Sequence, residues 1–153
     1  MKNLFLILLL SINSLAYAET VKFNESGFSI DILDEKPSNA GSQPLQMLLP
    51  AVNGFSANVN VQIQPYPGTL EEYKKLSEAQ FIQLGLKTIA SSTRGSAVVF
   101  EYSGFMMGNE LHFYAKAIKK GNLFYLATAT DLDSEWHKNS SRLKSIVNSF
   151  VLE

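Results

Sequence analysis

The sequence predicts an α+β fold: an α/β/α sandwich with a mainly antiparallel sheet of about six to seven strands and helices packed on its faces. Three observations lead to this prediction. Short segments in which apolar and polar residues alternate recur along the chain. Four of these segments follow one another with only short Gly-bearing turns between them. Two segments with the 3.6-residue period of an amphipathic helix flank that series.

The first strands are expected at residues 28–33, 45–49 and 57–64. The last of them alternates most cleanly, with Val59, Val61 and Ile63 on one face and amide side chains on the other. Between the first two, residues 35–42 have the composition of a loop. Pro65 and Pro67 should end the third strand, because proline has no N–H to donate to a neighbouring strand.

A helix should begin after Thr69, because Thr69 and Glu72 have the spacing of a capping box. Gly85 is well placed to end this helix in the left-handed conformation. The expected apolar face contains Leu70, Tyr73, Leu76, Phe81 and Leu84.

Four further strands are expected at residues 86–93, 96–103, 109–119 and 123–130, which is the spacing of an antiparallel meander. Several of them are apolar on both faces, so both faces of the sheet should be covered. A last helix is expected at residues 134–148, with one face made by Trp136, Leu143, Ile146 and Val147.

Residues 1–18 have the three parts of a secretory signal peptide: a positive Lys2, an apolar run at residues 4–10, and the cleavage signature Ala16-Tyr17-Ala18. The apolar run is far shorter than the ~20 residues that span a bilayer. We therefore expect cleavage after Ala18 and a mature single domain, residues 19–153, in the periplasm or outside the cell. It should have no stable membrane anchor.

Composition argues against several classes of function. The chain of 153 residues contains no cysteine, which excludes disulfides, thiolate metal sites and thiol catalysis. Its net charge of −1 argues against a nucleic-acid partner. It has no G-x-S-x-G, Walker or G-x-G-x-x-G motif, so neither an activated serine nor a phosphate-binding loop is indicated. We expect no cofactor, no metal and no catalytic residue.

Few residues offer chemistry. His112 should share a strand face with Glu110 and Tyr114, and His137 should be a solvated helix residue. Residues 131–135 place carboxylates at positions 1, 3 and 5 of a calcium loop, but Trp136 stands where such a loop needs glycine. Acidic residues are also common at a helix N-terminus, which is the simpler interpretation.

Several short motifs resemble the PsbP/DcrB-like family, whose fold is related to that of the Ran-binding Mog protein. They are Gly27–Ile30, Phe55–Val61, Thr69–Tyr73, Phe100–Gly104 and Ser149-Phe150. The similarity runs over most of residues 26–152. It implies an antiparallel sheet between helices and a role that is not enzymatic. Many bacterial members are lipoproteins, whereas this chain has no cysteine to carry a lipid.

Two segments could contact a partner. Phe105, Met106 and Met107 occupy a Gly-bounded turn, where polar residues are usual. Val52 and Phe55 lie in a loop and could line a groove. The alternative for both segments is that the side chains pack inward.

These observations favour an exported, non-catalytic binding or accessory protein of the bacterial envelope, with a protein partner of unknown identity. A second hypothesis is a small-molecule or lipid carrier with a groove between sheet and helix. A third is a hydrolase or metalloenzyme that uses His112 or the carboxylates at 131–135.

Overall fold

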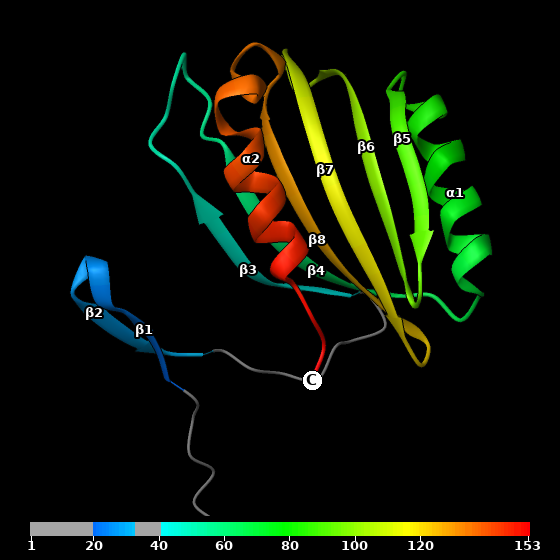
Figure 1. Ribbon diagram of the computed structural model, residues 1–153, viewed down its shortest axis with the longest axis horizontal. Helices are drawn as coiled ribbons and strands as arrows, with labels where there is room; N and C mark the ends of the chain where they lie inside the picture. Colours follow the sequence, from blue (N-terminus) through cyan, green and yellow to red (C-terminus); the bar gives the residue numbers. More distant parts are fainter. Residues whose placement is uncertain (1–19, 33–40) are drawn as a thin grey trace, which may run out of the picture. The chain divides into compact units, whose positions relative to one another are not determined.

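The computed structural model describes residues 20–32 and 41–153, which belong to two compact units (Figure 1). The predicted signal peptide and most of the predicted loop at 35–42 lie outside the described residues. The first unit is a hairpin of β1 (Thr20–Phe23) and β2 (Phe28–Asp31), joined by the short 3-10 helix η1 (Asn24–Ser26). Only β2 was predicted, because β1 is too short to show alternation.

The second unit is a six-stranded, fully antiparallel sheet with two helices, which confirms the expected α+β class. Its strand order is β3-β4-β8-β7-β6-β5, and β5 to β8 form the predicted meander. The strands are β3 (Ser42–Leu48), β4 (Asn58–Pro65), β5 (Lys87–Arg94), β6 (Ala97–Met106), β7 (Asn109–Lys120) and β8 (Leu123–Leu132), and the helices are α1 (Leu70–Gln83) and α2 (Asp133–Ser149).

The helix α2 covers one face of the sheet, where it lies across β4, β8 and β7 (Figure 1). Register explains the contact, because Val59 pairs with Ala129 and the two side chains point to the same face. The small Ala127 and Ala129 let the helix approach closely. The core on this face consists of Val59, Ala127, Ala129, Trp136, Leu143 and Val147.

The helix α1 covers the opposite face beside β5 and β6. Tyr73 is its main anchor: its ring stacks on Phe124 with centroids 3.8 Å apart, and its hydroxyl donates to Gln64 Oε1 at 2.7 Å. Burial raises the pKa of Tyr73 to about 12, so it stays neutral at ordinary pH. The core on this face consists of Tyr73, Val98, Phe100, Ala115, Ala117 and Phe124.

The predicted apolar face of α1 is partly wrong. Leu76 and Leu84 are 41% and 59% exposed, whereas Ser77 is buried. The helix packs against the sheet through a narrow stripe, and Ser77 fits that stripe because it is small and its hydroxyl donates to the Tyr73 carbonyl at 2.9 Å. The stripe consists of Leu70, Tyr73, Ser77 and Phe81.

Both ends of α1 carry the predicted caps. Thr69 and Glu72 form the capping box, in which each side chain bonds to the other residue's backbone N–H. At the other end, Gly85 has a φ of +72° and its N–H donates to Ile82, while Leu86 N–H donates to the Phe81 carbonyl. This pair of bonds is a Schellman motif, and it directs the chain into β5.

The antiparallel order brings four connections to one end of the sheet. We call this the loop end: it consists of the β3–β4 loop (residues 49–57), the α1–β5 turn (84–86), the β6–β7 turn (105–108) and the β8–α2 junction (131–133). At the opposite end lie the turn between β5 and β6, the turn between β7 and β8, and residues 150–153.

Gly104, next to the β6–β7 turn, lies against Gly85 and Leu86 of the α1–β5 turn. Its substitution by alanine should therefore destabilise the fold. A Cβ atom there would lie 2.9 Å from Leu86 Cδ2 and 3.3 Å from the Gly85 carbonyl oxygen. Because Leu86 would then have to shift, and L side chains rarely adopt the φ of +155° found at Gly104, we expect Gly104→Ala to lower the free energy of unfolding by about 1–3 kcal/mol in urea titrations. The neighbouring Ser103→Ala adds no atom and should change it by less than about 0.5 kcal/mol. Equal stability of the two variants would contradict this packing.

Candidate functional site

The loop end presents apolar side chains on a well-packed base. Beneath it lies a cluster of the buried Leu111, Phe113 and Leu132. Phe113 also stacks on Tyr102, with ring centroids 4.7 Å apart. The surface connections above this cluster are therefore supported by strands from the middle of the sheet.

Of the three residues at the β6–β7 turn that were predicted to contact a partner, two are exposed and one is packed inward. Phe105 and Met107 are 64% and 89% exposed. Met106 instead turns inward, where it packs against the cluster of Leu111, Phe113 and Leu132. Met107 has a φ of +54°, a left-handed conformation, and its carbonyl accepts from Asn109 Nδ2 at 3.3 Å. The turn thus presents two apolar side chains from a defined backbone.

The β3–β4 loop also has one exposed and one packed residue. Val52 is 48% exposed, whereas Phe55 is half-buried against the same cluster as Met106. Reciprocal backbone bonds of 2.8 and 3.0 Å join Val52 and Phe55, with Asn53 and Gly54 both at positive φ between them. The fold therefore brings the two predicted contact segments to one end of the sheet.

Leu84 adds a further exposed apolar side chain to the loop end. Its helical spacing predicts a place on the buried face of the helix, but it is 59% exposed. It immediately precedes Gly85, whose carbonyl oxygen faces Gly104 of the neighbouring hairpin. The one signal in the sequence was the position of Leu84 directly before Gly85, where the helix ends and its periodicity no longer applies.

A groove lies beside the loop end, between α2 and the strands β3 and β4. It has an apolar cavity of about 130 Å³ and, next to it, a more polar cleft of about 260 Å³. The cleft includes Val52 and Phe55, and both spaces share Leu49, Ala57 and Arg142. The predicted groove residues therefore do line a cleft.

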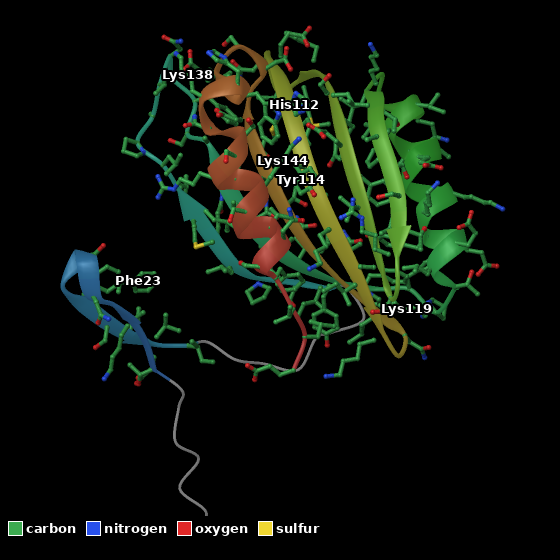
Figure 2. All side chains as sticks on the ribbon, in the orientation of Figure 1. Phe23, His112, Tyr114, Lys119, Lys138 and Lys144 are labelled. Atoms are coloured by element: carbon green, nitrogen blue, oxygen red, sulfur yellow. The ribbon has the colours of Figure 1, made fainter. Side chains whose placement is uncertain are left out.

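His112 belongs to a polar network that links α2 to the sheet (Figure 2). It is 8% exposed, its Nδ1 lies 2.9 Å from Asp133 Oδ1, and its Nε2 lies 3.0 Å from Glu101 Oε1. Its ring stacks on Trp136 with centroids 4.2 Å apart. Lys144 completes the network with a nitrogen 2.7 Å from Glu101 Oε1. The neighbours predicted from the strand, Glu110 and Tyr114, are not its hydrogen-bond partners.

This geometry leaves His112 poorly suited to catalysis. Each of its two ring nitrogens lies within hydrogen-bond distance of a carboxylate oxygen. A general base needs a free nitrogen that faces the substrate. His112 has none and lines none of the cavities described here, so its evident role is to join β6, β7 and α2.

The acidic segment at residues 131–135 does not converge on one point. Asp131 is buried and accepts from Leu132 N–H and from Asn139 Nδ2, each at 2.8 Å. Asp133 bonds to His112, and Glu135 pairs with Lys138 at 2.6 Å. Within residues 20–32 and 41–153, no group of three or more His, Asp or Glu side chains is placed to hold a metal ion. His137 is exposed on α2.

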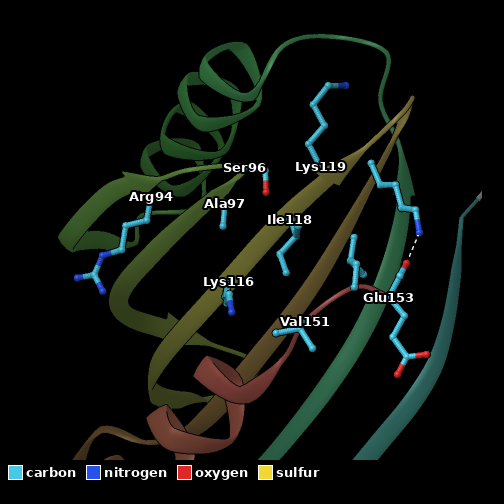
Figure 3. Close-up of a pocket in the computed structure, with 10 residues that line it drawn as sticks. Arg94, Ser96, Ala97, Lys116, Ile118, Lys119, Val151 and Glu153 are labelled. Atoms are coloured by element: carbon cyan, nitrogen blue, oxygen red, sulfur yellow. Dashed lines mark hydrogen bonds between the residues drawn. The ribbon is translucent and has the colours of Figure 1, made fainter.

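A cavity of about 440 Å³ lies at the other end of the sheet, between β7 and residues 151–153 (Figure 3). Lys116 Nζ donates to the carbonyls of Asn148 and Phe150 at 3.0 and 2.6 Å, and Lys120 Nζ donates to that of Glu153 at 2.6 Å. These ammonium groups satisfy the last carbonyls of α2 and hold the chain that follows it. Figure 3 shows Arg94 pointing away from them, so the cations do not converge on a ligand.

Comparisons with known proteins give a fold and no activity. No family model and no curated protein matches the chain. The chain is similar to the crystal structure of a Pseudomonas aeruginosa protein of unknown function, suggested to be a regulator. The two sequences are 14% identical, the match covers 88% of this chain and 96% of that chain, and the TM-score is 0.59. It is also similar to the solution structure of cyanobacterial PsbP from Synechocystis sp. PCC 6803. Here the sequences are 15% identical, the match covers 95% of this chain and 99% of that chain, and the TM-score is 0.49.

The first of these likenesses shows that the chain shares the fold of the Pseudomonas protein. Among the described residues, no helix is both long enough and apolar enough to cross a bilayer.

The His112 network should make stability depend on pH through Glu101. Burial raises the pKa of Glu101, but hydrogen bonds from Lys144 and His112 outweigh it, so the pKa lies below its ordinary value of 4.5. A lowered pKa stabilises the fold above the unfolded-state value, and that contribution is lost as the pH falls through the folded-state value. We expect Glu101→Gln to cost about 1 kcal/mol near pH 6 and progressively less towards about pH 3.

Urea unfolding followed by fluorescence of the single tryptophan, Trp136, measures this effect directly. The control is Glu110→Gln, which makes the same change at an exposed residue of β7 and should leave the pH profile unaltered. A constant difference between wild type and Glu101→Gln at all pH values would show that the charge of Glu101 does not matter.

Proposed function

We propose that this protein is a non-catalytic accessory protein of the bacterial envelope that binds a protein partner through the loop end. The observation that carries the proposal is the exposure of Phe105 and Met107, at 64% and 89%, on a turn whose base is packed through Met106. Large apolar side chains on a rigid support are typical anchors of protein interfaces. The flexible thioether of methionine adapts well to an irregular partner surface. The envelope location rests on the predicted signal peptide.

Cavity size favours this function over that of a lipid carrier. Pockets that enclose a drug-sized ligand measure roughly 300–1,000 Å³ and are mostly apolar. The apolar cavity beside α2 is about 130 Å³, too small for an acyl chain. The larger cavity at the other end is lined by lysines whose amines already bond to backbone carbonyls. The groove between sheet and helix therefore suits a single side chain better than a lipid.

The arrangement of polar groups favours binding over catalysis. Both ring nitrogens of His112 are engaged by carboxylates, and the acidic residues at 131–135 have separate partners. A hydrolase would need a nucleophile, a base and an oxyanion site at one cavity. The described residues do not bring such groups together.

Site-specific photo-crosslinking in the periplasm tests the proposal. A photoreactive phenylalanine analogue at position 105 should crosslink to a defined protein, which mass spectrometry identifies. The same analogue at Val151, which is 68% exposed at the opposite end, serves as the control and should not yield that product.

The purified partner then allows a quantitative test. Phe105→Ser combined with Met107→Ser should weaken its binding at least tenfold, because each anchor removed costs more than about 1 kcal/mol. Val151→Ser should bind like wild type, and all variants should unfold at similar temperatures because the substituted side chains are exposed. Unchanged affinity of the double variant would remove the loop end from the proposed function.

A further inference from the structure

We propose that the groove between α2 and the strands β3 and β4 binds an extended peptide segment in which an acidic residue adjoins an apolar residue of Leu or Met size. Arg142 would pair with the acidic side chain, and the small cavity would hold the apolar one. The inference rests on the proposed function only in that the peptide belongs to a protein partner. The groove shares the β3–β4 loop with the loop end, but Phe105 and Met107 do not line it, so the two proposals can be tested separately.

The apolar cavity has the size of one side chain. Its volume is about 130 Å³, close to the roughly 150 Å³ of an engineered protein cavity that binds benzene. It therefore matches the size of a leucine or methionine side chain better than that of tryptophan. Its walls are mostly apolar and come from two strands and a helix: Met47, Leu48, Leu49, Ala57, Asn58, Val59, Arg142, Leu143 and Ile146.

Arg142 supplies the charge selectivity. It is exposed, it borders both the apolar cavity and the polar cleft, and no other basic side chain lines either space. No described residue forms a hydrogen bond or ion pair with its guanidinium group. The two acids in the cleft each have a hydrogen-bond partner: Lys138 offsets the charge of Glu135, whereas the neutral amide of Asn139 orients Asp131 without offsetting its charge. The guanidinium group is therefore available to a carboxylate from a partner.

The surface around the cavity favours an apolar residue from the interior of the partner's chain over a residue at the end of that chain. Leu45 and Met47 pair with Val61 and Val59, so their side chains point to the face that α2 covers. They are 38% and 37% exposed, which continues the apolar wall along the edge strand β3. On the other side of Arg142, the cleft of about 260 Å³ continues towards Val52 and Phe55. The surface thus continues on both sides of the apolar cavity and Arg142, where further residues of an extended peptide can bind.

A peptide array tests this directly. The probe is a set of octapeptides, acetylated and amidated so that their ends carry no charge, with a central Glu-Leu pair and varied flanking residues. We expect the protein to select members of this set, and fluorescence polarisation then gives their affinities. Replacing the Glu by Gln, or the Leu by Ala or Trp, should weaken binding about tenfold, the value of one charge-assisted bond or one buried side chain.

Protein variants provide the matching control. Arg142→Gln should weaken binding of the selected peptide about tenfold and remove the protein's preference for Glu over Gln in that peptide. Arg94→Gln makes the same charge change at the other end of the sheet, where the arginine also lacks an acidic partner, and should bind like wild type. Failure of every peptide to bind, or full binding by Arg142→Gln, would overturn the inference. Neither result would alter crosslinking at position 105, so the two proposals can fail independently.

Discussion

The constraint on which the structure depends is that the central strands are apolar on both faces. Phe124 points to the face that α1 covers, while Ala127 and Ala129 point to the face that α2 covers. A strand that is buried on both sides requires a layer above and a layer below it. The two helices provide these layers, and antiparallel order then places the turns of the meander alternately at the two ends of the sheet.

The two ends differ in the way their polar groups are used. Opposite the loop end, Lys116 and Lys120 bond to backbone carbonyls after α2, so their ammonium groups stabilise the chain itself. Near the loop end, the network of His112, Glu101 and Asp133 joins helix to sheet below the surface. These charged groups bond to one another, and the exposed side chains at the loop end include the apolar Val52, Leu84, Phe105 and Met107.

Much of this architecture follows from local sequence patterns. Alternation predicted β4 closely, and the capping box of Thr69 and Glu72 marked the start of α1 because both partners lie within one turn of helix. The face of α1 was less predictable. Helical period alone cannot distinguish the stripe through Ser77 from one through Leu76, because the choice depends on which strands lie beneath the helix.

By itself, the amino-acid sequence determined the fold class and the order of most elements, since these depend on residue type and short-range spacing. Tertiary structure alone decided which residues meet. His112 lies next to Glu101 and Asp133, not Glu110, because its partners come from another strand and from α2. Likewise Met106 and Phe55, far apart in the chain, share one cluster, while Phe105 stays exposed. Such contacts depend on strand order and register, which join distant segments and leave no local pattern in the sequence.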